Sequence, residues 1–220
     1  MGTDDLFKKR RKEKKGRQHE MRLPKADSIF IVTEGEKTEP AYFQALASKV
    51  IAARGGNIDV RIEGLGRGTT SLVEKAAELL ARSPKVFQHV WVVFDKDDFD
   101  DFDEAILLAR EYGFNVAWSN QAFEYWLLLH FEFSDAALGR SDWTRKLDAL
   151  FRQRGIREKG YEKNLSDIYE IVTTFGSEQF AISNAKCMRD GFKGRSPSSC
   201  DPSTTVYELV ELLNSFLECV

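Results

Sequence analysis

The chain alternates between short apolar runs and longer segments in which apolar residues recur at helical spacing. The runs at residues 28–34 and 90–95 are rich in β-branched and aromatic residues and end in charge, which is typical of strands buried on both faces of a sheet. Shorter runs predict two more strands, at residues 58–63 and 115–119. Helical spacing predicts the intervening helices at residues 40–53, 72–82 and 102–112.

Local signals predict where some of these helices begin and end. Ser71 is a candidate N-cap, and Glu74, three residues later, would complete a capping box. Gly113 is a candidate C-cap, because glycine adopts the left-handed conformation that often ends a helix.

The pattern changes after residue 120, where no further strand is predicted and helices follow one another. A dense aromatic helix is predicted at residues 123–133, and a Gly/Ser/Pro-rich loop at residues 190–203. The other predicted helices lie at residues 142–154, 165–174, 178–189 and from Ser203 or Thr204, as cap, to about residue 219. This order predicts an α/β fold in which a parallel sheet is flanked by helices, with a helical C-terminal half. Residues 28–220 would form one domain, made of an α/β core at 28–120 and a helical part at 121–220 packed on it.

Composition excludes several classes of protein. With 220 residues and 42% hydrophobic content, the chain has enough apolar residues for a sizeable core. The three cysteines are far apart and the three histidines lack ligand spacing, so neither a disulfide framework nor a zinc site is predicted. Neither a signal peptide nor an apolar stretch that could span a membrane is found, and we expect a cytoplasmic protein without membrane contact.

The net charge of −3 hides an asymmetry along the chain. Residues 1–27 hold ten Lys/Arg and five Asp/Glu, a balance of +5, which leaves −8 for the remainder. This segment is predicted to be a disordered basic arm. It would either bind nucleic-acid phosphates or serve as a solvated tail.

Two acidic clusters follow the two longest apolar runs. Glu34 comes directly after the first run, beside Gly35, and Asp95 and Asp97 come after the run at 90–95. Ligands bind at the carboxyl ends of the strands in open α/β sheets, and carboxylates crowded there favour a hard divalent cation such as Mg²⁺. The alternative is that acidic residues after a strand only cap the next helix, which is the role expected for Asp100, Asp101 and Asp103.

These clusters also carry a resemblance to known proteins. Glu34-Gly35 after the first strand and Asp95-x-Asp97 after the third resemble the Toprim catalytic core. Longer segments resemble the RloB-like family: VTEGEKTEPAYF at residues 32–43, VFDKDD at 93–98, SNQAFEYWLLLHF at 119–131 and DPSTTVYELV at 201–210.

The resemblance implies a Toprim-like, metal-dependent nuclease that hydrolyses phosphodiester bonds in DNA or RNA, including tRNA. Glu34, Asp95 and Asp97 would be catalytic, and together with Asp98 they would bind Mg²⁺, or alternatively Mn²⁺. RloB-like genes often accompany an AAA-type ATPase in prokaryotic loci for defence against phage, which implies such a partner here. The alternative is a non-catalytic Toprim-like adaptor or regulatory partner of an ATPase.

Several other residues are candidates for supporting roles. Lys37 and Arg67 flank glycine-containing turns, and the loop at residues 64–70 would form an anion-binding nest before a helix. Lys186 is a further candidate for binding substrate phosphate. Glu39 and Glu124 would support the metal site, although a structural ion pair is an equal alternative for Glu124. His130 is predicted to be a satisfied core histidine.

Overall fold

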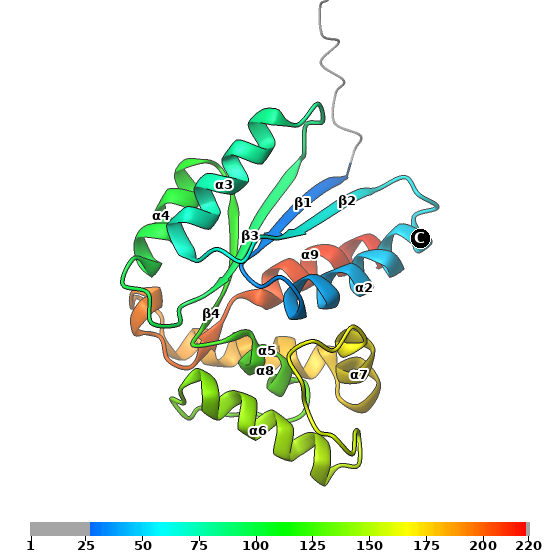
Figure 1. The fold of residues 1–220 in the computed structure, drawn as a ribbon, viewed down its shortest axis with the longest axis vertical. Helices are drawn as coiled ribbons and strands as arrows, with labels where there is room; N and C mark the ends of the chain where they lie inside the picture. Colours follow the sequence, from blue (N-terminus) through cyan, green and yellow to red (C-terminus); the bar gives the residue numbers. More distant parts are fainter. Residues whose placement is uncertain (1–26, 219–220) are drawn as a thin grey trace, which may run out of the picture.

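Four parallel strands and one short antiparallel strand form a single sheet in the computed structural model, which describes residues 27–218. The sheet order is β2-β1-β3-β4-β5 (Figure 1). The strands are β1 (Ser28–Thr33), β2 (Asp59–Gly64), β3 (His89–Asp95), β4 (Asn115–Asn120) and β5 (Ser203–Thr204). Because β1 and β3 are neighbours and parallel, their carboxyl ends lie at the same edge of the sheet.

Helices cover both faces of the sheet, and a further layer of helices lies beyond its carboxyl edge (Figure 1). One face packs against α3 (Thr69–Arg82) and α4 (Phe102–Glu111), and the other against α2 (Thr38–Ala53) and α9 (Val206–Glu218). The C-terminal layer comprises α5 (Phe123–Leu129), α6 (Arg140–Gln153), α7 (Ile168–Phe175) and α8 (Glu178–Gly191), and the short 3₁₀ helix η1 (Pro197–Ser199) contacts α4. The predicted α/β fold with a helical C-terminal half is therefore confirmed.

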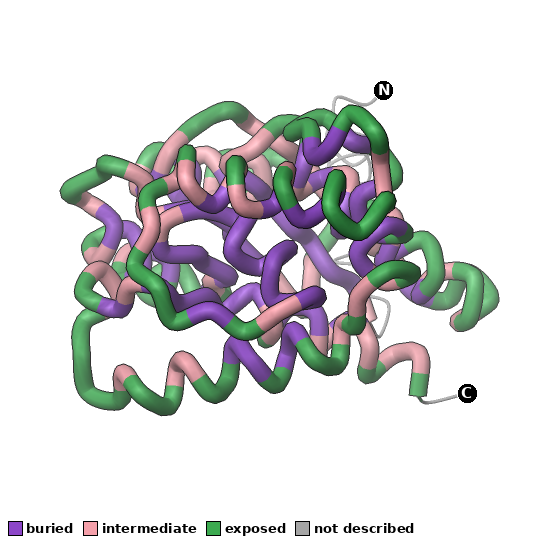
Figure 2. Tube along the Cα trace, turned by 90° about the horizontal axis from the view of Figure 1, so that it is seen from below, coloured by how far each residue is buried: buried purple, intermediate pink, exposed green. Residues whose placement is uncertain are grey.

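The central strands are apolar on both faces because each face meets a separate core. Ile29 and Ile31 of β1 point into the larger cluster, with α2 and the C-terminal helices. Phe30 and Val32 point into the smaller cluster, with α3 and α4. Figure 2 shows the buried strands inside a shell of helices whose outer surfaces are exposed. The alternation of side chains along a strand thus explains why both sets of residues are apolar.

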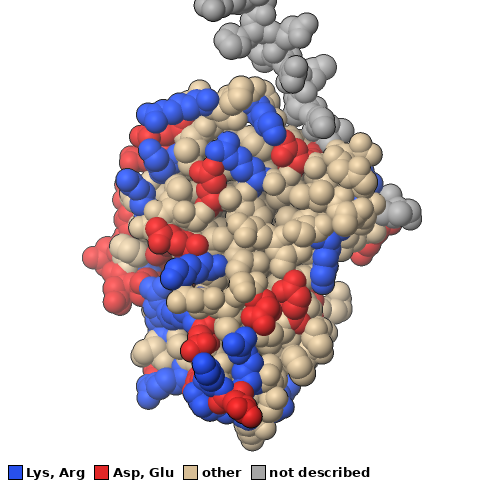
Figure 3. Space-filling view, turned by 45° about the vertical axis from the view of Figure 1, so that its right-hand side comes forward, with Lys and Arg blue, Asp and Glu red and all other residues tan. Residues whose placement is uncertain are grey.

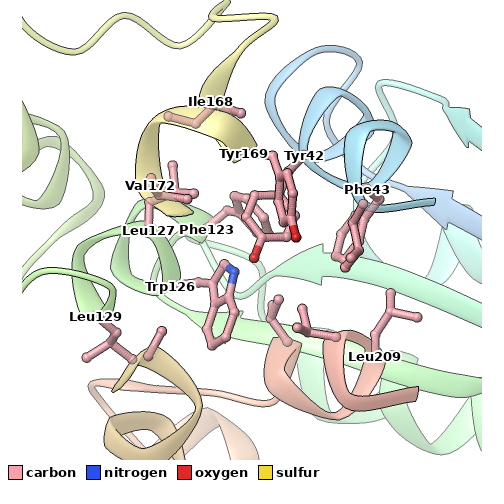
Figure 4. Packing of buried hydrophobic residues seen from close by; sticks show 14 of the residues in the cluster. Tyr42, Phe43, Phe123, Trp126, Leu127, Leu129, Ile168, Tyr169, Val172 and Leu209 are labelled. Atoms are coloured by element: carbon pink, nitrogen blue, oxygen red, sulfur yellow. The ribbon is translucent and has the colours of Figure 1, made fainter. Parts of the chain in front are cut away.

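The larger core is built around α5, all seven residues of which are buried. Tyr42 packs edge to face against Phe123, with ring centroids 5.6 Å apart, and against Tyr169, at 5.1 Å (Figure 4). His130 lies at the end of this helix: its Nδ1 donates to the carbonyl oxygen of Trp126 at 3.1 Å, and its Nε2 lies 3.4 Å from the Tyr42 hydroxyl. Burial lowers the pKa of His130 to about 4, so the ring is neutral. The prediction of a satisfied core histidine is confirmed.

The capping box predicted for α3 is wrong. The helix begins at Thr69 and its N-cap is Gly68, whereas the Ser71 hydroxyl donates to the Gly68 carbonyl. The cap comes instead from another loop, because the backbone N–H of Thr70 donates to the Asp101 carboxylate at 3.3 Å. Both threonine hydroxyls donate to that carboxylate at 2.6 Å. A carboxylate from another loop accepts a free N–H group at the start of this helix, and a local sequence pattern cannot show such a long-range hydrogen bond.

Other boundaries differ from prediction by a few residues. Gly113 follows α4 with φ of +74°, as expected for a glycine that ends a helix. Ser203 and Thr204 pair with β4 as β5, and the Thr204 hydroxyl accepts the Val206 N–H at 3.2 Å, so α9 begins two residues after β5. Within residues 27–218, every helix is too short or too polar to cross a membrane. The predicted basic arm, apart from Asp27, lies outside the described residues.

Candidate active site

A pocket of about 440 Å³ opens where β1 and β3 end, between the sheet and the C-terminal helices. Its wall includes five carboxylates, those of Glu34, Glu36, Glu39, Asp95 and Glu124. Four cationic side chains also line it, those of Lys37, Arg67, Arg140 and Lys163. On the face drawn in Figure 3, basic and acidic side chains likewise lie next to one another, most densely toward the left of the view. The pocket differs from the surface in that several of its charges are buried.

Glu34 is fixed at the end of β1 by hydrogen bonds to the neighbouring strand, β3. Its N–H donates to the Val93 carbonyl at 2.8 Å, and its Oε2 accepts the N–H of Asp95 at 3.2 Å. Burial raises the pKa of Glu34 to about 7; the bond from Asp95 opposes this shift, and the negative charge of Glu39 adds to it. The prediction that Glu34 and Asp95 meet at the carboxyl ends of adjacent strands agrees with this geometry.

Gly35 makes room for a second carboxylate. A Cβ atom at this position would lie 2.0 Å from Oε2 of Glu39, which sits in the first turn of α2. Burial raises the pKa of Glu39, and the charge of Glu124 raises it further. The glycine after β1 therefore lets the Glu39 carboxylate lie against the backbone of Gly35, next to Glu34.

Asp95 forms the floor of the pocket and is only 5% exposed. Its Oδ2 accepts the backbone N–H of Phe123 at 3.0 Å, at the start of α5. Burial raises the pKa of Asp95 well above its ordinary value, and the charges of Glu39, Glu34 and Glu124 act in the same direction. One hydrogen bond to a helix end does not offset this crowd of negative groups.

Asp97 takes a different direction from Asp95. β3 ends at Asp95, and Asp97 has φ of +42°, so the backbone is not extended between them. The rule that residues two apart on a strand point the same way therefore does not apply to this pair. The Asp97 carboxylate pairs with Nη1 of Arg140, at the start of α6. Asp97 is close enough for its charge to act on Glu34, but it is not part of the pocket wall.

Glu124 is 4% exposed and has two partners from the loop between α6 and α7. The Tyr161 hydroxyl donates to its Oε1 at 3.3 Å, and the Lys163 ammonium lies 3.3 Å from the same oxygen. The ion pair considered for this residue is present, and Glu124 also lines the pocket, whereas its support of a metal site stays a prediction. Sequence reasoning missed Arg140, Tyr161 and Lys163; the only signal for them was that a buried Glu124 needs partners.

The remaining candidates divide into two groups. Lys37 and Arg67 line the pocket, whereas Asp98 is exposed and outside the pocket wall. Lys186 is on α8, where its ammonium lies 2.5 Å from Oε1 of Glu211 on α9, and it too is outside the wall. In the loop at 64–70, the Thr70 N–H is already bonded to Asp101, so it is not available to the proposed anion nest.

The carboxylates fit Mg²⁺ in donor chemistry, since this ion takes oxygen ligands. Within residues 27–218, however, no group of three or more His, Cys, Asp or Glu side chains is arranged so that it could hold a metal ion. Glu34 and Asp95 each accept a backbone N–H through one oxygen, and Asp97 pairs with Arg140. The pocket therefore contains suitable carboxylate oxygens, but they do not converge on one point.

Comparisons with known proteins add one result. A family model described as RloB-like protein matches residues 29–213. Comparisons with curated proteins and with solved structures gave no match. The matched range includes the whole pocket wall and every helix and strand, apart from Ser28 at the start of β1 and the last residues of α9.

Proposed function

Since the chain belongs to the RloB-like protein family, we propose that it is a Mg²⁺-dependent phosphodiester hydrolase acting on nucleic acid. The observation that carries this proposal is the group of buried and half-buried carboxylates at the carboxyl ends of β1 and β3. Burial and mutual repulsion raise the pKa of Glu34, Glu39 and Asp95 together. A divalent cation would relieve that repulsion, and cationic side chains beside it suit a phosphate-bearing substrate.

In this proposal each residue has a separate task. Glu34 and Asp95 would hold Mg²⁺, supported by Glu39 and Glu124, and Asp97 would be a further ligand if its ion pair with Arg140 were broken. When bound, Mg²⁺ neutralises charge that develops on the phosphoryl oxygens. Alternatively, Glu34 leaves the metal to the other carboxylates and accepts a proton from the attacking water, because its pKa of about 7 in the metal-free pocket suits acid–base chemistry near neutral pH.

The cationic side chains bind the phosphate of the substrate. Lys163 is held at the wall by Glu124, and Lys37 and Arg67 stand at exposed positions of the same wall. Their positive charge attracts the phosphate backbone and keeps it near the carboxylates. The family resemblance supports a role in antiphage defence in the prokaryotic cytoplasm, with an AAA-type ATPase as partner.

A second candidate function is that of a non-catalytic adaptor for an ATPase. The ion pair between Asp97 and Arg140 favours it, because one of the predicted metal ligands is already neutralised by the protein itself. The two candidates differ in one measurable property, since an adaptor does not need to bind Mg²⁺ or Mn²⁺ in the pocket.

The test combines metal binding with cleavage. Mn²⁺ binding to the full chain is measured by electron paramagnetic resonance, for the wild type and for Glu34→Gln and Asp95→Asn. Labelled DNA and total tRNA are then incubated with Mg²⁺, Mn²⁺ or EDTA, with and without the partner ATPase. We expect Mn²⁺ binding and metal-dependent cleavage in the wild type, and loss of both in the two variants. Absence of Mn²⁺ binding by the wild type would overturn the metal-dependent hydrolase and favour the adaptor.

A further inference from the structure

An aromatic ring stands at the rim of the acidic pocket. Phe99 lies in the loop between β3 and α4, where its N–H donates to the Lys96 carbonyl at 3.1 Å. The side chain lines the pocket together with Asp95, and it is 41% exposed. A large apolar side chain at the mouth of a charged pocket has a surface available to a ligand there.

The position of this ring depends on a glycine in the opposite loop. A Cβ atom at Gly68 would lie 2.5 Å from Cζ of Phe99 and 2.8 Å from its Cε2. Any larger residue at position 68 would push the ring away, so Gly68 lets it rest directly on the loop before α3. The first two residues of α3, which follow that loop, are tied to the β3–α4 loop through the hydrogen bonds from Thr69 and Thr70 to Asp101. The two loops therefore hold Phe99 at the rim from both sides.

The depth and size of the pocket restrict what can reach its floor. Asp95 and Glu124 are almost completely buried, and the volume of about 440 Å³ is that of a small-ligand site. A base-paired duplex presents its phosphates on the outside of a wide, stiff rod. A separated strand is narrow and flexible, so it can bring a phosphate to these buried carboxylates more readily than a duplex can.

We infer that Phe99 is a stacking platform for an unpaired base, and that the substrate is single-stranded nucleic acid or an unpaired segment of a folded one. Bases of single strands stack on exposed aromatic rings without regard to sequence. The neighbouring cations, Lys37 and Arg67, would bind the adjoining phosphates. This inference rests on the proposed function for its choice of nucleic acid, but it concerns binding and not hydrolysis.

The experiment measures binding without metal, so that failure of catalysis does not affect it. Fluorescence anisotropy in EDTA follows the full chain binding a labelled single strand of about 16 nucleotides, and the blunt duplex of the same sequence. The variants are Phe99→Ala, Phe99→Trp and Phe180→Ala. Phe180 is the matched control, because it is 43% exposed on α8 and is not part of the pocket wall.

We expect Phe99→Ala to bind the single strand about fivefold to a hundredfold more weakly than the wild type. Phe99→Trp should retain the affinity and Phe180→Ala should not change it. Binding of the duplex should be the same for all four proteins. Three results would overturn the inference: wild-type affinity in Phe99→Ala, equal losses in Phe99→Ala and Phe180→Ala, or an equal loss of duplex binding in Phe99→Ala.

Discussion

The acidic pocket and the aromatic core around α5 both bury polar groups, and they do so in opposite ways. In the core, the neutral His130 ring donates to the carbonyl of Trp126 and lies beside the hydroxyl of Tyr42. In the pocket, Glu34 and Asp95 each accept one backbone N–H while neighbouring carboxylates raise their pKa. The same short helix takes part in both, since Glu124 is in its first turn and His130 follows its last residue.

This difference indicates that the polar group of the core is structural and that the carboxylates of the pocket are functional. A buried polar group with complete partners helps to specify the core, and removing it costs stability. Carboxylates that repel one another lower the stability of the apo protein, and such a cluster is typical of a site that binds a charged ligand. The predictions below test whether the two regions respond in these opposite ways.

The largest effect is expected for Asp95→Asn. The amide side chain can still accept the Phe123 N–H but removes a negative charge from the pocket floor. Metal-dependent cleavage should fall more than about 100-fold, since even residues that only orient metal ligands cost 10- to 100-fold. The apo protein should be as stable as the wild type or up to about 2 kcal/mol more stable, because repulsion is relieved. Cleavage assays and thermal melting in EDTA check the two parts.

Asp103→Asn is the control for this prediction. Asp103 belongs to the same acidic run, but its Oδ1 accepts the N–H of Ser198 at 2.9 Å, outside the pocket wall. This variant should lose about 1 kcal/mol of stability and keep its activity. Equal losses of activity in both variants would show that the acidic run acts as a whole and that Asp95 has no special role.

The sequence predicted one half of the candidate site better than the other. Glu34 and Asp95 could be placed together because each follows an apolar run, and parallel neighbouring strands end at the same edge. Asp97 was predicted on the assumption that β3 continues, but the strand ends at Asp95 and the chain turns with positive φ. A spacing of two predicts a common direction only within an extended strand.

Two of the four cationic side chains in the pocket wall, those of Arg140 and Lys163, could not be predicted, whereas Lys37 and Arg67 were. Arg140 and Lys163 come from the start of α6 and the loop before α7, which are distant in sequence from both acidic clusters. They reach the pocket because the C-terminal helices pack beyond the edge of the sheet, and no motif near them encodes that packing. The predicted N-cap of α3 was wrong for the same reason, because the carboxylate that accepts the Thr70 N–H is that of Asp101, in another loop.

The second prediction concerns His130→Gln and the core. The folded-state pKa of about 4 lies below the ordinary value of 6.5, so the neutral ring contributes stability above pH 6.5 that is lost as pH falls toward 4. The full contribution is up to about 3 kcal/mol. Urea unfolding of the wild type and of His130→Gln between pH 4 and 7 measures it. The difference in stability between them should shrink as pH falls; a constant difference would contradict the neutral, buried histidine.

The third prediction is the same measurement on Glu34→Gln, and its sign is opposite. The pKa of Glu34 is raised from 4.5 to about 7, so its contribution is fully present below pH 4.5 and is lost as pH rises through 7. Relative to the wild type, Glu34→Gln should gain about 2 kcal/mol of stability between pH 4.5 and 8, measured in EDTA. If stability relative to the wild type fell with rising pH, Glu34 would be a paired structural residue like His130.

The smallest effect is expected for Arg140→Gln, which tests whether the Arg140 guanidinium offsets the negative charge of the pocket when no metal is bound. The guanidinium pairs with Asp97, and this partly exposed ion pair contributes little to stability, within about 1 kcal/mol. Its positive charge repels a divalent cation at Asp95 and Glu34, so its removal should tighten Mn²⁺ binding by about threefold to tenfold. Substrate affinity should change in the other direction, because a phosphate-binding cation is lost. Electron paramagnetic resonance gives the first quantity and anisotropy with a labelled oligonucleotide the second. Arg145→Gln is the matched control, since the exposed Arg145 lies on the same helix and pairs with the half-buried Asp142. It should change neither affinity; weaker Mn²⁺ binding in Arg140→Gln would mean that Arg140 holds the carboxylates in place and does not compete with the metal.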